Sequence, residues 1–164
     1  MAQNIHRVFP LMANAAEQLV AALCMRRNLM TFPAPPRNEG YDLACIHPDP
    51  RKVDKVIRIQ VKSRYQCDCN DVFDFHPKSL GAFDYFAAVF LNTGFYYSKK
   101  KFAPEGLTDP QVYLLPHDFV RDHYAHRPTR SGMKVSRVDQ QMRQFLCPQA
   151  LEQVASVLEV PYPK

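Results

Sequence analysis

The segment 56–63 alternates strictly between apolar and polar side chains, which predicts a β-strand with one face in the core. The apolar positions are Ile57, Ile59 and Val61. The opposite face carries Gln60 and Lys62 side by side, because side chains two residues apart share a face. A chain that contains this strand must cover its apolar face with further elements and give its polar face a partner or water.

Asp42 lies upstream, inside the apolar run 41–46 that we expect to form the preceding strand. The short polar link 47–51 indicates that the two strands form a hairpin. A carboxylate within an apolar strand is costly unless another group pairs with it. We therefore predict that Asp42 and Lys62 meet on adjacent strands.

Asn14 and Glu17 have the spacing of a capping box, in which an N-cap side chain is followed three residues later by an acid. The residues from Asn14 to Met30 then repeat apolar side chains at helical spacing, which predicts a helix. Glu17 lies at the edge of the apolar stripe. It is interpreted either as a capping acid, which a helix start favours, or as a functional side chain.

The rest of the chain alternates between expected strands and helices. Strands are predicted at 72–75, 85–91 and 112–115, a turn or short helix at 76–83, and helices at 117–124 and 148–160. Proline and glycine mark 31–40 as a connector and 92–111 as a long irregular segment. Together these elements predict an α/β fold in one domain, residues 1–164, with a mixed β-sheet flanked by α-helices.

Composition narrows the class of protein. An apolar content of 46% is typical of a globular chain, and a net charge of +5 is compatible with a polyanionic partner. The odd number of cysteines, five, indicates free thiols in a reducing compartment. The first ten residues lack an apolar signal core, and no apolar run reaches the about 18 residues of a membrane span. We expect a cytoplasmic protein without a membrane partner.

Two acids, an amide and an ammonium in this order suggest a metal site with a catalytic lysine. Asp42 would supply a carboxylate oxygen, Gln60 its amide oxygen and Val61 its backbone carbonyl to a hard cation such as Mg²⁺, or Mn²⁺. Glu17 would hold a metal-bound water. Lys62 would orient or deprotonate the attacking water and counter the charge that develops on a phosphate.

The motifs 40–42 (Gly-Tyr-Asp) and 58–63 (Arg-Ile-Gln-Val-Lys-Ser) resemble those of the PD-(D/E)XK nuclease superfamily, which has the restriction-endonuclease-like fold. The Q-x-K spacing is most similar to a branch that includes small intron-encoded homing endonucleases. The resemblance extends over roughly residues 14–115. It implies a metal-dependent endonuclease that hydrolyses phosphodiester bonds in DNA, with Mg²⁺ or Mn²⁺ as cofactor. Enzymes of this fold often dimerise, so it also implies a homodimer or higher homo-oligomer.

Gln60 stands where this family usually has a carboxylate, and a neutral amide binds Mg²⁺ less well. One alternative is therefore a catalytically inactive nuclease-like protein that binds DNA or regulates another factor. A second is that Gln60 and Lys62 form the solvated face of an edge strand. A third is a protein-interaction module whose basic loops meet an acidic partner.

Two basic segments are weaker candidates for DNA contacts, since lysines contact phosphates and aromatic rings stack on bases. They contain Lys99, Lys100 and Lys101, next to Tyr96, Tyr97 and Phe102, and then Arg127, Arg130 and Lys134. Both segments are equally compatible with solvated charge runs. Cys67 and Cys69, with His76 downstream, are spaced too closely for a usual zinc site, so zinc is the less favoured interpretation there.

Overall fold

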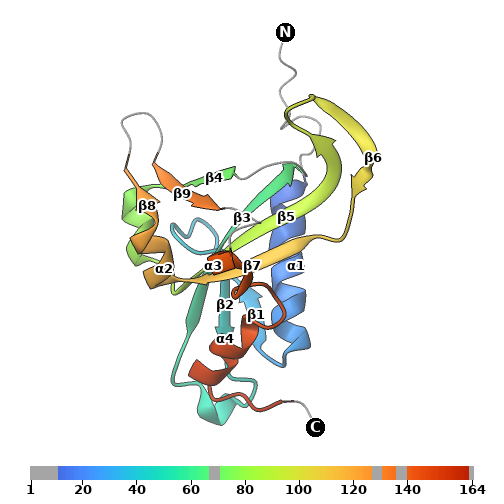
Figure 1. The fold of residues 1–164 in the computed structure, drawn as a ribbon. Coiled ribbons are helices and arrows are strands. Elements are labelled where there is room, and N and C mark those ends of the chain that lie inside the picture. Colours follow the sequence, from blue (N-terminus) through green and yellow to red (C-terminus); the bar gives the residue numbers. More distant parts are fainter. Residues whose placement is uncertain (1–10, 67–70, 127–130, 136–139, 163–164) are drawn as a thin grey trace.

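The computed structural model describes residues 11–66, 71–126, 131–135 and 140–162. Its centre is a six-stranded sheet in the order β1-β2-β3-β5-β6, with β7 paired to β5 (Figure 1). The strands are β1 (Met30–Pro33), β2 (Leu43–Ile46), β3 (Ile57–Gln66), β5 (Tyr85–Tyr96), β6 (Lys101–Leu107) and β7 (Gln111–Pro116). β3 and β5 are parallel, whereas the other neighbours are antiparallel. The predicted mixed sheet and the predicted β2–β3 hairpin are confirmed.

β3 lies between β2 and β5, so it is an inner strand. The interpretation of segment 56–63 as an edge strand is therefore wrong. Ile57, Ile59 and Val61 are all buried, with exposed fractions of 6%, 0% and 6%, as the alternation predicted. Parallel pairing with β5 requires a crossover connection, and the stretch between the two strands supplies it.

Helices cover the face that carries these three residues. α1 (Met12–Arg26) contributes Ala16, Val20 and Cys24 to this core, and α4 (Leu151–Val157) contributes Leu151 and Val154. Cys24 is fully buried and free, as expected of a small apolar side chain. No helix in the described part of the chain is long and apolar enough to span a membrane.

A second core covers the opposite face of the sheet. There Phe73 lies edge-on to Phe86 and Phe90 of β5, with ring centroids 5.7 Å apart in both pairs. The elements on this side are β4 (Asp71–Asp74), β8 (Tyr124–Ala125), β9 (Gly132–Val135), α2 (His117–Asp122) and α3 (Gln140–Arg143). β4, β9 and β8 form a small three-stranded sheet, which Figure 1 shows at the upper left. Short 3₁₀ helices, η2 (Pro50–Lys52) and η3 (Pro77–Gly81), complete the connections.

The predicted capping box is wrong. α1 begins at Met12 with Leu11 as its N-cap residue, which makes no side-chain capping bond, so Asn14 lies inside the helix. The helix also ends at Arg26 rather than Met30. Asn28 adopts a left-handed backbone with φ of 66°, which turns the chain into β1.

Two segments that proline and glycine marked as irregular contain strands. The connector 31–40 begins with most of β1, and the segment 92–111 holds the end of β5 and all of β6. Backbone pairing overrides the local preference of Pro104, because β6 is an edge strand and an edge strand tolerates proline. The final helix, predicted at 148–160, is regular only over the range of α4.

Candidate active site

The site is built where β2 begins beside β3. The first β2–β3 pair joins Leu43 to Ile59, and Asp42 immediately precedes Leu43. The Asp42 N–H donates to the Ile59 carbonyl at 2.9 Å. Its carboxylate Oδ2 accepts the Val61 N–H at 2.6 Å. The Asp42 side chain thus replaces the backbone carbonyl that a longer β2 would offer to β3.

Gln60 is the second partner of this carboxylate. Its side chain is buried, with an exposed fraction of 5%, and its Nε2 donates to Asp42 Oδ2 at 2.5 Å. The hairpin therefore does bring Asp42 to the polar face of β3. The predicted pairing of Asp42 with Lys62 is wrong, however, since the carboxylate bonds to Gln60 and to the Val61 N–H. A half-buried carboxylate needs close donors, and those on its own hairpin provide them.

Lys62 is half-buried on β3, two residues beyond Gln60 on the same face. Glu17 is half-buried on α1. The pKa of Glu17 is raised above its usual value, first by burial and then by the negative charge of Asp42, while the positive charge of Lys62 opposes the rise. Glu17 therefore lies within electrostatic range of both Asp42 and Lys62. Gln60 is the one predicted site residue that contacts Asp42 directly.

The oxygens at this site suit a hard cation. Asp42 offers Oδ1, because both of its hydrogen bonds are to Oδ2. The Val61 carbonyl lies on the same side of β3 as its N–H, because both groups of a strand residue point to one neighbour. A cation would also relieve the repulsion between Glu17 and Asp42 that raises the Glu17 pKa. This set fits Mg²⁺ or Mn²⁺ with several retained waters.

Gln60 departs from the predicted arrangement in one respect. Its Nε2, and not Oε1, faces Asp42, so the amide acts here as a donor that holds the carboxylate. A role as metal ligand requires the amide to present Oε1 instead. Within the described residues, no group of three or more histidine, cysteine, aspartate or glutamate side chains is arranged to hold a metal. Metal binding at this site would therefore depend on an amide or carbonyl oxygen in addition to Glu17 and Asp42.

An ion pair that was not predicted from the sequence positions the start of β3. Asp84 accepts three hydrogen bonds from Arg58: from the backbone N–H at 2.7 Å, Nε at 3.1 Å and Nη2 at 2.9 Å. In return the Asp84 N–H donates to the Arg58 carbonyl at 2.9 Å. These bonds hold β3 against the start of β5, two residues before Gln60. The available signal was Arg58, a charge on the polar face of an inner strand that required a partner.

The basic segments lie elsewhere. Lys99, Lys100 and Lys101 are exposed at the turn between β5 and β6, and Lys134 is exposed on β9. Neither group lies at the start of β2, where Asp42 is. Arg127 and Arg130 fall outside the described residues, as do Cys67 and Cys69. His76 caps η3, where its Nδ1 accepts the Lys78 N–H at 3.2 Å.

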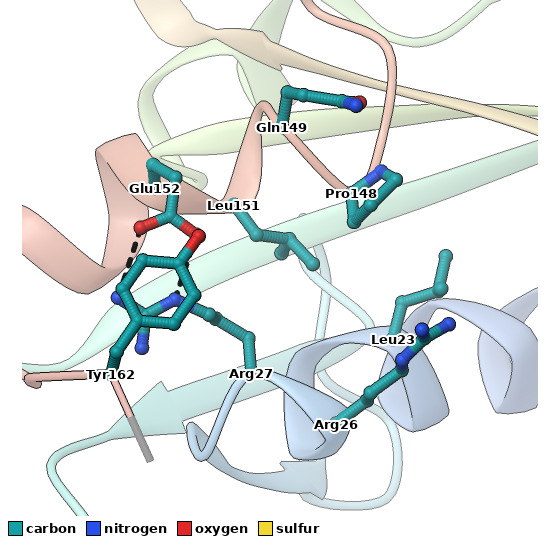
Figure 2. Close-up of a pocket in the computed structure, with 8 residues that line it drawn as sticks. All are labelled: Leu23, Arg26, Arg27, Pro148, Gln149, Leu151, Glu152 and Tyr162. Carbon is teal, nitrogen blue, oxygen red and sulfur yellow. Dashed lines mark hydrogen bonds and ion pairs between the residues drawn. The ribbon is translucent and has the colours of Figure 1, made fainter. Parts of the chain in front are cut away.

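A cavity of about 300 Å³ lies between α1 and the segment that leads into α4 (Figure 2). Arg27 donates to both carboxylate oxygens of Glu152, at 2.8 and 2.9 Å, and the Tyr162 hydroxyl donates to the same carboxylate at 2.8 Å. Figure 2 shows the Tyr162 ring against this pair. Arg27 follows Glu17 by about 15 Å of helix, so the cavity is remote from Asp42. Arg27 and Glu152 in its lining join the C-terminal segment to the end of α1.

Comparison with known proteins supports the fold. No protein-family model matches the chain, and no curated protein matches it by sequence. Among solved structures, the bacterial homing endonuclease I-Ssp6803I is similar, with a TM-score of 0.55 and 13% sequence identity. The likeness covers 92% of this chain and 93% of that one. The chain therefore has the fold of that protein over nearly its whole length.

Proposed function

We propose that the protein is a metal-dependent DNA endonuclease of the PD-(D/E)XK superfamily that hydrolyses phosphodiester bonds. The observation that carries the proposal is the bond between Asp42 and Gln60 at the start of β2, with Glu17 in electrostatic range of Asp42 and Lys62. The likeness to a homing endonuclease supports it, since the comparison covers nearly all of both chains.

In this proposal Asp42 and the Val61 carbonyl hold Mg²⁺ or Mn²⁺, with Gln60 as a further ligand when its Oε1 is presented. The bound ion would lower the pKa of a water and stabilise charge on the phosphate. Lys62 would hold the attacking water in line and place a positive charge beside the phosphate oxygens. Glu17 would accept a hydrogen bond from a metal-bound water and so fix its orientation.

DNA is the proposed partner, and the exposed Lys99, Lys100, Lys101 and Lys134 are the proposed contacts to its phosphates. Arg127 and Arg130 remain predictions of the same kind. A homodimer or higher homo-oligomer is proposed because small enzymes of this fold often dimerise to cut two strands. Size-exclusion chromatography with light scattering tests that part, and a monomer at all concentrations would contradict it.

The experiment compares plasmid cleavage by the wild-type chain, Lys62→Ala and Lys55→Ala in Mg²⁺ or Mn²⁺. Lys55 is an exposed lysine paired with Glu159, and its loss serves as the matched control. We expect Lys62→Ala to lose about 10²–10⁴-fold in rate, the usual contribution of a positioned proton-transfer group, and Lys55→Ala to keep its rate. EDTA should abolish cleavage. Equal rates for the two variants would rule out this site.

A catalytically inactive DNA-binding or regulatory protein of the same fold is the second candidate. The bond from Gln60 Nε2 to Asp42 favours it, because it satisfies the carboxylate without a metal. Salt-dependent DNA binding without Mn²⁺ binding or cleavage would select this candidate. Cleavage that appears only in Gln60→Glu would indicate a nuclease that has lost its activity.

A further inference from the structure

The β5–β6 hairpin extends beyond the rest of the sheet. β7 pairs with β5 only between Tyr85 and Phe90, and β3 pairs with it no further than Phe95. Beyond Phe95 only the pair Tyr96–Lys101 and the turn 97–100 continue, and together with the adjoining parts of β5 and β6 they form a ribbon. Figure 1 shows this hairpin curving outward at the upper right, past the ends of the other strands.

The ribbon is an ordered element with its own packing. Gly94 has φ of 81°, and the ring of Phe102 occupies the space where a Gly94 side chain would lie. The ring of Tyr96 does the same at Gly106. Aromatic rings laid over glycines of an edge strand help to fix the register of the strand pair, and glycine kinks curve it. The hairpin therefore presents its tip in a defined direction.

Three consecutive exposed lysines, Lys99, Lys100 and Lys101, form the tip. Phe102 is 58% exposed beside them, and Lys99 Nζ lies 5.5 Å from the centroid of the Tyr96 ring. A second copy of the chain bound to the same tip would bring like charges together. A polyanion is complementary to it, and the exposed ring adds an apolar surface for base edges.

The geometry points to insertion of this tip into the major groove of duplex DNA, an inference that rests on the proposed function and names how its substrate is held. The major groove is about 12 Å wide and admits a two-stranded β-ribbon. The lysines then contact the phosphates on either side, and Phe102 contacts base edges. Lys62 precedes Gln66, the partner of Phe95, by four residues of β3, or about 13 Å. The reacting phosphate and the tip therefore lie within one turn of the duplex, about 34 Å.

The test measures binding to a 30-base-pair duplex in the Lys62→Ala background, so that cleavage does not interfere. The tip variant combines Lys99→Gln, Lys100→Asn and Lys101→Gln. Asparagine replaces Lys100 because that residue has φ of 48°, which asparagine tolerates. The control variant removes three cations near η2, with Arg51→Gln, Lys52→Gln and Lys55→Gln. Each is titrated against plain duplex and duplex whose cytosines carry a neutral glucosyl-hydroxymethyl group, which fills the major groove without changing the phosphate charge.

We expect the tip variant to lower the slope of log affinity against log salt by about 2–3, which corresponds to three lost phosphate contacts, and the control variant to change it by less than about 1. The protein with an intact tip should bind the glucosylated duplex about tenfold more weakly than plain duplex, and the tip variant should bind both equally. The single change Lys100→Glu provides a second measurement if the triple variant folds poorly.

Equal slopes for the tip and control variants would overturn the inference, and so would equal binding of the two duplexes by the intact tip. Tip-dependent binding without cleavage by the wild-type chain would contradict the proposed function and leave the groove contact standing. Cleavage that depends on Lys62, combined with DNA binding that the tip variant leaves unchanged, would support the proposed function and contradict the groove contact. Binding of the tip to anionic vesicles in preference to DNA would also overturn it.

Discussion

Asp84→Asn is expected to destabilise the protein, because Asp84 holds the start of β3 against β5. Asparagine can still accept the Arg58 backbone N–H, but its amide group removes the ion pair with the guanidinium. The two bonds that are lost join Nε and Nη2 of Arg58 to the carboxylate at 3.1 and 2.9 Å. Asp84→Asn should also lower the rate of DNA cleavage, because it weakens the pairing of β3 with β5 that positions Gln60.

The expected loss of stability depends on how far the Arg58–Asp84 ion pair is exposed to solvent. Bonds to charged groups contribute about 1.5–3 kcal/mol when shielded, and exposed ion pairs contribute about 0–1 kcal/mol. The side chains of Arg58 and Asp84 are 38% and 32% exposed, which places the pair between these limits. We expect a loss of about 1–2 kcal/mol in the free energy of unfolding, from the same two magnitudes. The melting temperature should fall by about 2–4 °C for each kcal/mol.

Urea unfolding monitored by circular dichroism measures this loss, with Asp118→Asn as the matched control. Asp118 also pairs with an arginine, Arg121, at 2.9 Å, but its side chain is 76% exposed. The control should lose less than about 0.5 kcal/mol. Equal losses in the two variants would refute the assignment of a positioning role to Asp84.

The difference between wild type and Asp84→Asn should also depend on pH. Burial disfavours the charged form of Asp84, but the bonds from Arg58 outweigh it and lower the pKa of the carboxyl. The ionised form is therefore stabilised in the folded protein. The advantage of wild type should be complete above the ordinary aspartate pKa of about 3.9 and should disappear as the pH falls through the lowered value. An advantage that persists at the lowest pH would contradict the ion pair.

Gln60→Glu should strengthen Mn²⁺ binding about tenfold in calorimetric titration, because a carboxylate is a better ligand than an amide, and an unchanged affinity would place the ion away from Gln60. Arg27→Met should cost about 2–3 kcal/mol in urea unfolding, because this residue bonds to Glu152 and to the carbonyls of Val160 and Pro161 with an exposed fraction of only 9%. Its exposed neighbour Arg26 is the control, and Arg26→Met should change the free energy of unfolding by less than about 0.5 kcal/mol. Equal losses in the two variants would refute the stabilising role of the Arg27 bonds.

The centre of the fold was predictable because its signals are local and strong. Strict alternation identified the buried face of β3, and the unbroken apolar run at 85–91 identified most of β5. The short link between 46 and 57 predicted the hairpin that brings Asp42 to Gln60. For the hairpin, the periodicity of the strands and the cost of an unpaired carboxylate both predicted that Asp42 lies beside β3.

The edges of the sheet were not predictable from local signals. β1 contains Pro33, and β6 contains Pro104 and Gly106, residues that a single sequence presents as loop formers. Their strand conformation comes from backbone pairing with β2 and β5, which depends on residues distant in the chain. The capping box failed for a similar reason, since the helix begins before Asn14 and needs no side-chain cap there.

The detail of the candidate site lay beyond the sequence as well. Pattern placed Asp42, Gln60 and Lys62 on one hairpin, but it did not distinguish which donor would reach the carboxylate. The start of β2 decides this, because no residue before Leu43 pairs with β3 and the Val61 N–H donates to Asp42 Oδ2 instead. Gln60 then adds its amide to the same oxygen.

The central claim is that Asp42 and the polar face of β3 bind a catalytic divalent cation. Anomalous diffraction from crystals soaked in Mn²⁺ tests it most directly, with Asp42→Asn crystals as the control. We predict a Mn²⁺ peak between the Asp42 carboxylate and the Val61 carbonyl, with Glu17 facing the waters of the ion, and its loss in Asp42→Asn. Saturating Mn²⁺ that leaves Asp42 bonded only to Gln60 and Val61 would contradict the claim.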